Sequence, residues 1–142
     1  MARLKINHVA MSVPPERLSP EGRKEIMAFY NDVFGFNEFE MMAKDGERMV
    51  INTGPMQHFI YLHGEDPPMD CPRLDHFGYS VETLEEFDEI YDKAVEWSKR
   101  DDRVDLVEKQ VENLEGAVEM TSFYVGYLMP MMIELQHWKF LH

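Results

Sequence analysis

Two stretches of the sequence repeat each other: KINHVAMSV at residues 5–13 and RLDHFGYSV at residues 73–81. Each contains a histidine at the same place, His8 in the first copy and His76 in the second, and each closes on Ser-Val. The chain has 142 residues, which is enough to bury a core as one domain. The repeat therefore predicts that this domain is a tandem duplication of one smaller folding unit.

Each copy of the repeat is followed by the pattern of an amphipathic helix. After the first copy, Ser19-Pro20 marks a helix start, and apolar residues spaced i, i+3, i+4 and i+7 continue towards a helix end near Gly35. After the second copy, Thr83 and Glu86 form a capping box. The apolar stripe of this second helix consists of Leu84, Phe87, Tyr91 and Val95.

Strand-length segments complete each half of the chain. The last segments correspond, IYLH at residues 60–63 and IELQ at residues 133–136, which aligns Tyr61 with Glu134. Each half therefore reads βαβββ, over about residues 4–66 and 72–138, and the predicted fold class is α+β. The turn signals between the strands are Asp45-Gly46, Gly54-Pro55, Glu115-Gly116 and Met129-Pro130.

Strand alternation indicates which side chains share a face. His8 and His76 lie on the same strand face as the residues two positions before and after them. Two equivalent units that pack about a pseudo-twofold axis can bring these equivalent histidines into one cleft. The residues expected on the two histidine faces are Ile6, Ala10 and Ser12 in the first copy, and Leu74, Gly78 and Ser80 in the second.

Glu134 is the third residue of a possible metal site. It alternates with Ile133 and Leu135, which should pack on the opposite face, and a carboxylate on such a strand is costly to bury unless something binds it. Two imidazoles and one carboxylate are the set favoured by non-haem Fe(II), and they also suit Mn, Ni, Co or Zn. Taken singly, each residue also fits a satisfied core histidine or a rim carboxylate. The matching positions of His8 and His76 favour a divalent metal site.

The composition limits the partners. A formal net charge of -13 opposes binding to nucleic acid or to an anionic membrane. The single cysteine, Cys71, cannot form an internal disulfide, which fits a reducing compartment. We recognise no signal peptide and no apolar run of membrane-spanning length. The sequence therefore predicts a soluble, cytoplasmic protein.

The arrangement of the repeat resembles the vicinal oxygen chelate superfamily, which covers glyoxalase I, methylmalonyl-CoA epimerase, fosfomycin- and bleomycin-resistance proteins, and extradiol dioxygenases. The resemblance covers residues 4–138 and rests on the paired βαβββ pattern with His8, His76 and Glu134. It implies that the two modules form a curved mixed sheet around a metal-binding cleft. The implied metal ligands come from the first strand of each module and the last strand of the second.

Within this superfamily the sequence most resembles the extradiol dioxygenases. Glyoxalase I and the epimerases typically have a fourth ligand, Glu or Gln, at the position of Tyr61, and a neutral phenol is a poor ligand for a divalent ion. The stretch MTSFYVGYLMPMMIELQHW resembles the dioxygenase segment in which Ser-Phe-Tyr precedes the ligand Glu, which implies an active-site role for Tyr124. The stretch MQHFIYLH resembles the segment with the acid/base histidine, which implies His58.

The resemblance to the dioxygenases has gaps. A second active-site histidine of many dioxygenases would fall at Glu115, and residues 128–130 replace the usual turn before the final strand. In a regular strand His58 would face away from the metal side unless it lies at the strand entry or in a bulge, and His63, in phase with Tyr61, is the alternative. His137 and His142 are expected to face solvent.

The favoured function is therefore a ring-cleaving, extradiol-type dioxygenase that uses Fe(II) and acts on a small aromatic diol. The alternative is a glyoxalase-type metal-dependent lyase, isomerase or thiol transferase. A non-catalytic resistance protein that binds a small molecule is disfavoured, because such proteins usually lack the metal ligands. The expected partners are a small organic substrate and a second copy of the chain in a homodimer, with Trp97 and Trp138 as candidate interface residues.

Overall fold

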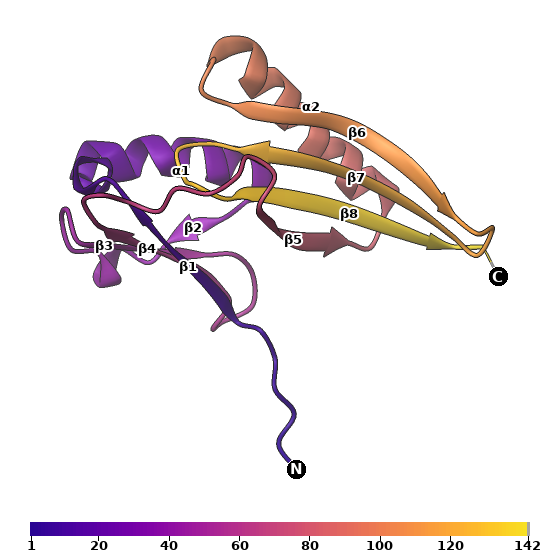
Figure 1. The fold of residues 1–142 in the computed structure, drawn as a ribbon, viewed down its shortest axis with the longest axis horizontal. Coiled ribbons are helices and arrows are strands. Elements are labelled where there is room, and N and C mark those ends of the chain that lie inside the picture. Colours follow the sequence, from indigo (N-terminus) through magenta and orange to yellow (C-terminus); the bar gives the residue numbers. More distant parts are fainter. Residues whose placement is uncertain (142) are drawn as a thin grey trace. The chain divides into compact units, whose positions relative to one another are not determined.

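The computed structural model describes residues 1–141. The chain divides into two compact units, Met1–Asp70 and Cys71–His142, called here the first and second modules. Each module contains a four-stranded mixed sheet, in the order β1-β4-β3-β2 in the first and β5-β8-β7-β6 in the second (Figure 1). The two orders correspond strand for strand, so the predicted α+β fold of two βαβββ modules is confirmed. That the modules together make one domain over residues 1–142 stays a prediction.

The first module contains β1 (His8–Val13), the 3-10 helix η1 (Pro15–Leu18), α1 (Pro20–Phe34), β2 (Asn37–Glu38), the 3-10 helix η2 (Glu40–Met42), β3 (Arg48–Asn52) and β4 (Phe59–Gly64). Helix α1 begins and ends as the sequence predicts. The Ser19 hydroxyl accepts a hydrogen bond from the Gly22 N–H at 3.0 Å, and Gly35 closes the helix with φ of 75°. The predicted apolar face of α1, Ile26, Phe29, Tyr30 and Val33, is buried.

The second module contains β5 (His76–Val81), α2 (Leu84–Arg100), β6 (Asp105–Leu114), β7 (Val118–Gly126) and β8 (Met132–Phe140). The predicted capping box forms in part, since the Thr83 hydroxyl accepts from the Glu86 N–H at 3.1 Å. Leu84 is 46% exposed, contrary to the predicted stripe, because it is the first residue of the helix and burial begins one turn later at Phe87. None of the helices among residues 1–141 is long and apolar enough to cross a membrane.

The repeated strands begin later than the repeat itself. β1 starts at His8 and β5 at His76, so the prediction that Ile6 and Leu74 share a strand face with the histidines is wrong. The reason lies in the partner strands, because β4 and β8 begin directly opposite the two histidines and the parallel ladders extend no further upstream. The side chains of Ile6 and Leu74 are accordingly exposed.

The two faces of the second sheet have different roles. Ile133 and Leu135 of β8 are buried, as predicted, and Leu135 pairs with Phe123 of β7. Phe123 in turn packs edge-on against Phe87 of α2, with ring centroids 5.5 Å apart. This apolar face therefore packs against α2. The alternate residues of β7 and β8, including Tyr124 and Glu134, point to the other face.

An ionic corner follows α2. The Asp101 carboxylate accepts hydrogen bonds from the Arg103 guanidinium at 2.8 and 3.0 Å, from the Arg103 N–H at 3.0 Å, and from the Tyr127 hydroxyl at 2.8 Å. These bonds, first of all those from the Arg103 side chain, hold the pKa of Asp101 well below its ordinary value. The corner therefore ties the end of α2 to the residues that follow β7.

Candidate metal centre

Two of the three predicted metal ligands meet in the second module. β5 and β8 run parallel, and Glu134 of β8 pairs with Gly78 of β5. His76 lies two residues before Gly78, on the same face of β5. The His76 Nε2 atom lies 3.6 Å from the Glu134 Oε1 atom. Two atoms that each bind one ion at about 2.1 Å lie at most about 4.2 Å apart. The pair is therefore close enough to share a divalent ion.

The surroundings of His76 direct its outer nitrogen towards a ligand. Its Nδ1 atom lies 2.8 Å from the Leu74 carbonyl oxygen. A carbonyl only accepts, so this contact is a hydrogen bond when Nδ1 carries the proton. The lone pair of the neutral ring is then on Nε2, the nitrogen that faces Glu134, and a hydrogen bond of this kind fixes ring orientation in histidine metal ligands.

Glu134 is a buried carboxylate, with 5% of its surface exposed. The Gln136 side chain donates to its Oε1 atom at 2.7 Å, and Tyr124, its ladder partner on β7, also hydrogen-bonds to it. Burial of an anionic group is costly without such partners. The two donors supply the compensation that the sequence predicts Glu134 to need.

Tyr124 lies against both of these residues. Its ring meets the His76 ring edge-on, with centroids 4.9 Å apart. Burial raises the pKa of the Tyr124 phenol, and so do its hydrogen bond to Glu134 and the charges of Glu134 and Glu112. Tyr124 therefore keeps its proton at neutral pH and acts as a hydrogen-bond donor.

His8 belongs to the first module and lies at the start of β1. Its ring stacks on Phe59, its ladder partner on β4, with centroids 4.8 Å apart and planes at 8°. Its Nδ1 atom lies 2.7 Å from the Asn7 side-chain oxygen, so Nε2 is again the nitrogen left for a ligand. His8 and His76 are thus both exposed residues at the start of a strand, and in each the Nδ1 atom is engaged by a neighbouring oxygen within its own module.

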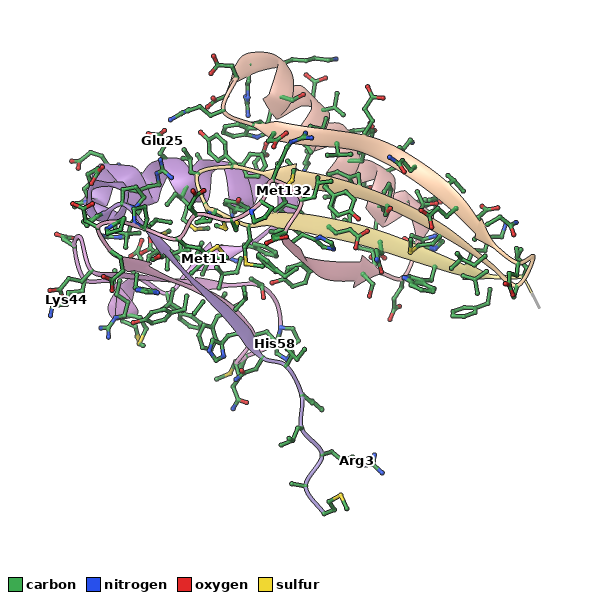
Figure 2. All side chains as sticks on the ribbon, in the orientation of Figure 1. Arg3, Met11, Glu25, Lys44, His58 and Met132 are labelled. Carbon is green, nitrogen blue, oxygen red and sulfur yellow. The ribbon has the colours of Figure 1, made fainter. Side chains whose placement is uncertain are left out.

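The two candidate acid/base histidines lie at opposite ends of β4. His58 precedes the strand, in a turn where its N–H donates to the Pro55 carbonyl, and it lies by the start of β1 (Figure 2). It therefore lies at the strand entry, one of the two places where the strand-parity objection to His58 does not hold. His63 lies near the far end of β4, in phase with Tyr61, and contacts Glu65 at 3.4 Å.

The other histidines lie elsewhere. His137 is half-buried and, by strand alternation, lies on the opposite face of β8 from Glu134. His142 lies outside the described residues. Within residues 1–141, no group of three or more His, Cys, Asp or Glu side chains is gathered so that it could hold a metal ion. The second module brings together two of the predicted ligands, His76 and Glu134, and the three-residue metal site with His8 stays a prediction.

Two further residues belong to this hydrogen-bonded group, Gln136, for which the sequence predicts no role, and Trp138, for which it predicts only an interface role. The Trp138 indole N–H donates to the Gln136 side-chain oxygen at 2.7 Å, and Gln136 donates to Glu134. A signal was available in the sequence, because residues 134, 136 and 138 alternate along one strand and must share a face.

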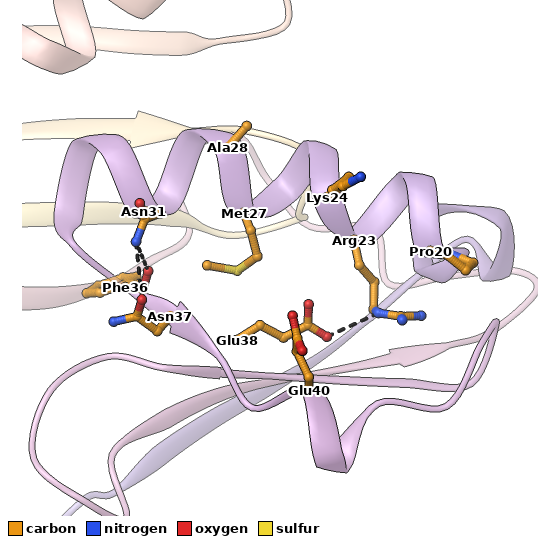
Figure 3. A pocket seen from close by; sticks show the side chains of 10 residues that line it. All are labelled: Pro20, Arg23, Lys24, Met27, Ala28, Asn31, Phe36, Asn37, Glu38 and Glu40. Atoms are coloured by element: carbon orange, nitrogen blue, oxygen red, sulfur yellow. Dashed lines mark hydrogen bonds and ion pairs between the residues drawn. The ribbon is translucent and has the colours of Figure 1, made fainter.

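A groove in the first module contains none of the predicted site residues (Figure 3). It has a volume of about 660 Å³ and lies between α1 and the β2–η2 segment. The Arg23 guanidinium donates to Glu38 at 3.1 Å and to Asp45 at 2.6 Å. Burial raises the pKa of Glu38 against the opposing effect of Arg23. Arg23 and Glu38 thus neutralise each other within the module. We place no functional site in this groove.

Comparison with known proteins identifies the fold. No protein-family profile matches the sequence, and no curated protein matches it either. Solved structures do match. A lactoylglutathione lyase from Agrobacterium tumefaciens is 16% identical over 96% of each chain, with a TM-score of 0.65. A glyoxalase/bleomycin resistance protein/dioxygenase from Alicyclobacillus acidocaldarius is 15% identical, covering 94% of this chain and 91% of that one, with a TM-score of 0.63. The chain has the vicinal oxygen chelate fold.

The vicinal oxygen chelate fold is compatible with several reactions. The fosfomycin resistance protein FosX from Mesorhizobium loti also matches, with 11% identity over 96% of this chain and 93% of that one, and a TM-score of 0.61. At these identities the likeness concerns the scaffold, because one fold can host unrelated chemistries. The predicted superfamily resemblance is confirmed at the level of fold, and the reaction must be argued from the site.

Proposed function

We propose that this protein is a metal-dependent enzyme in which His8, His76 and Glu134 bind one divalent ion. The observation that carries the proposal is the buried Glu134 carboxylate, 3.6 Å from the outward nitrogen of His76. The donor set of two neutral imidazoles and one carboxylate suits Fe(II), and also Mn, Ni, Co or Zn. The matching arrangement of His8 supports its inclusion as the third ligand.

The reaction we favour is the extradiol-type cleavage of a small aromatic diol. Tyr61, at the position of the fourth ligand in glyoxalase-type proteins, leaves the proposed ion with three protein ligands and open positions for a bidentate substrate. Fe(II), when bound, would supply coordination of the diol and activation of oxygen. Among the chain's own residues, Tyr124 would turn its single phenolic proton from Glu134 to a substrate oxygen and donate a hydrogen bond there. His58 would take the proton of the second hydroxyl and return it later in the reaction.

The second candidate is a glyoxalase-type lyase, isomerase or thiol transferase. The lactoylglutathione lyase and FosX among the matching structures support it, and one matching FosX variant from Listeria monocytogenes was solved with Mn(II). In that case Fe(II) would be replaced by another divalent ion and no oxygen would be consumed. We also propose that the protein acts as a cytoplasmic homodimer, which light scattering at micromolar concentration would contradict by finding a monomer.

Metal content tests the ligand assignment. Elemental analysis should find a stoichiometric divalent ion in the wild-type protein and none in the His8→Ala, Glu134→Ala double variant. His137→Ala removes a histidine from the opposite face of β8 and should leave the metal content unchanged. Stoichiometric metal in the double variant would refute the site.

Oxygen uptake then separates the two reactions. Protein loaded anaerobically with Fe(II) is supplied with a panel of catechols, and the extradiol reading predicts oxygen consumption with at least one of them. Turnover of the methylglyoxal–glutathione adduct or of an acyl-CoA, without uptake for any catechol, would establish the glyoxalase-type alternative instead.

A further inference from the structure

Three side chains on one face of β8 form a continuous chain of hydrogen bonds that ends on Glu134. Trp138 Nε1 lies 2.7 Å from Gln136 Oε1, and Gln136 Nε2 lies 2.7 Å from Glu134 Oε1. The chain is possible because residues two apart on a strand project to the same side. It connects an indole that is 41% exposed to a carboxylate that is 5% exposed.

The direction of this chain is fixed by the chemistry of its two ends. The indole N–H can only donate, and an ionised carboxylate can only accept. The Gln136 amide must therefore turn its oxygen to Trp138 and its NH₂ group to Glu134, and the opposite orientation would lose both bonds. Trp138 and Glu134 thus together determine which way the Gln136 amide points, and Trp138 reinforces the orientation in which Gln136 donates to Glu134.

Burial in the core does not explain why the side chains of Gln136 and Trp138 are held in fixed conformations. Gln136 is half-buried and Trp138 exposed, so both side chains give up rotamer freedom in exchange for the two hydrogen bonds. The bonded atom of Glu134 is Oε1, the same oxygen that lies 3.6 Å from His76 Nε2. The chain therefore holds the carboxylate in the orientation in which one oxygen faces the histidine.

We propose that Gln136 is a positioning residue of the metal centre and that Trp138 acts on the centre through Gln136. This inference rests on the proposed metal site, since the advantage of a fixed Glu134 is a preformed pair of donors. Residues hydrogen-bonded to metal ligands commonly change metal affinity by about 10- to 100-fold when they are removed. Gln136 should have an effect of that size, although it does not bind the ion itself.

Titration with Zn²⁺ alone tests the proposal without any assay of activity. Gln136→Met keeps the length of the side chain and removes both hydrogen bonds, and calorimetry should show Zn²⁺ binding weakened by about 10- to 100-fold. Gln136→Asn keeps the amide but is too short to reach both partners, and it should weaken binding in the same direction. Gln110→Met makes the same exchange at an exposed position of β6 and should leave the affinity unchanged.

A double-variant comparison distinguishes positioning from general disturbance of the sheet. Trp138→Phe should weaken Zn²⁺ binding by only about 2- to 10-fold, the effect of one neutral hydrogen bond. Combined with Gln136→Met it should have no additional effect, because the chain is already broken. In a Trp97→Phe background Trp138 is the sole tryptophan. Its emission should change on Zn²⁺ addition, and this change should disappear in Gln136→Met.

The outcomes separate the inference from the function on which it rests. Unchanged Zn²⁺ affinity in both Gln136 variants would overturn the positioning role while the metal site stands. Additive effects of Gln136→Met and Trp138→Phe would show that Trp138 does not act through Gln136. A wild-type protein that does not bind Zn²⁺, Mn²⁺ or Fe²⁺ would overturn the metal site and the inference together.

Discussion

Tyr61 holds in the first module the position that Glu134 holds in the second. Tyr61 pairs with Ala10 in the β1–β4 ladder, and Glu134 pairs with Gly78 in the β5–β8 ladder. Ala10 and Gly78 each lie two residues after a predicted ligand histidine. The alignment of IYLH with IELQ is thereby confirmed in three dimensions. At this position the two modules share a backbone but differ in chemistry, since a phenol replaces a carboxylate.

The substitution Tyr61→Glu should supply a carboxylate as a fourth protein ligand to the proposed metal site. We expect divalent metal binding to strengthen by on the order of tenfold or more, because the charge count of the ligands tunes metal affinity over orders of magnitude. We also expect catechol-dependent oxygen uptake to fall as an open position is filled. Calorimetric titration with Mn²⁺ measures the first effect. Tyr61→Phe, which removes only the hydroxyl, is the control, and equal affinities in the two variants would contradict the prediction.

His58 and His63 can be separated by single substitutions. If His58 is the acid/base group, His58→Ala should lower kcat by roughly 10²- to 10⁴-fold while metal content stays intact. His63→Ala should then have little effect. Steady-state oxygen uptake and elemental analysis on the same preparations provide both readings. Full activity in His58→Ala with a loss of activity in His63→Ala would show that His63, which is in strand phase with Tyr61, is the acid/base group.

The elements of the fold were accessible from the sequence because their signals are local. Ser19, Gly35 and Thr83 are caps whose partners lie within five residues, and alternation in β8 separates the faces of Ile133 and Glu134. The starts of β1 and β5 were not accessible, because they are set by where β4 and β8 begin. The hydrogen-bond chain through Gln136 was not accessible from the sequence either, because it too depends on the three-dimensional structure. Alternation assigns a face, but the bonding of side chains on that face depends on rotamers.

Tyr124 should make stability depend on alkaline pH. Its folded-state pKa is raised above the ordinary value of 10.0, so the folded protein holds the phenol proton more tightly than the unfolded chain. The contribution is fully present below that ordinary value and is lost as pH rises through the raised one. We expect the difference in unfolding free energy between wild type and Tyr124→Phe to stay constant up to about pH 9 and to narrow as the pH rises beyond about 10. Urea unfolding measures it.

The alkaline experiment needs a control, because lysines also titrate in this range. Tyr91→Phe removes a hydroxyl from α2, away from Glu134. The difference between wild type and Tyr91→Phe should not follow the pH course seen for Tyr124→Phe. A free-energy difference for Tyr124→Phe that stays constant over the whole range would contradict the assigned shift.

Asp101 should contribute to stability in the opposite pH direction. Its folded-state pKa lies below the ordinary value of 3.8, first of all because of the Arg103 side chain. The contribution is therefore present above that ordinary value and is lost as pH falls through the lowered one. We expect Asp101→Asn to unfold at lower urea concentration than wild type at neutral pH. The two midpoints should converge as the pH is lowered towards about 2.

The matched variant for this experiment is Asp102→Asn, which changes the exposed neighbouring carboxylate. It should leave the urea midpoint close to that of wild type at neutral pH, because surface substitutions rarely change stability by more than about 0.5 kcal/mol. Equal midpoints for wild type and Asp101→Asn at neutral pH would show that the ionic corner does not stabilise the second module.

The alternation along β8 places residues that pack in the core and residues that carry polar chemistry on opposite faces of a single strand. Ile133 and Leu135 have their side chains in the core, and a change of size at either would be felt throughout the module. Glu134 and Gln136, between and beside them, face the other side. A single codon change there can add or delete a donor without disturbing the packing behind it. A duplicated module of this design can therefore change its chemistry while it keeps its shape, and Tyr61 opposite Ala10 is an instance of such an exchange.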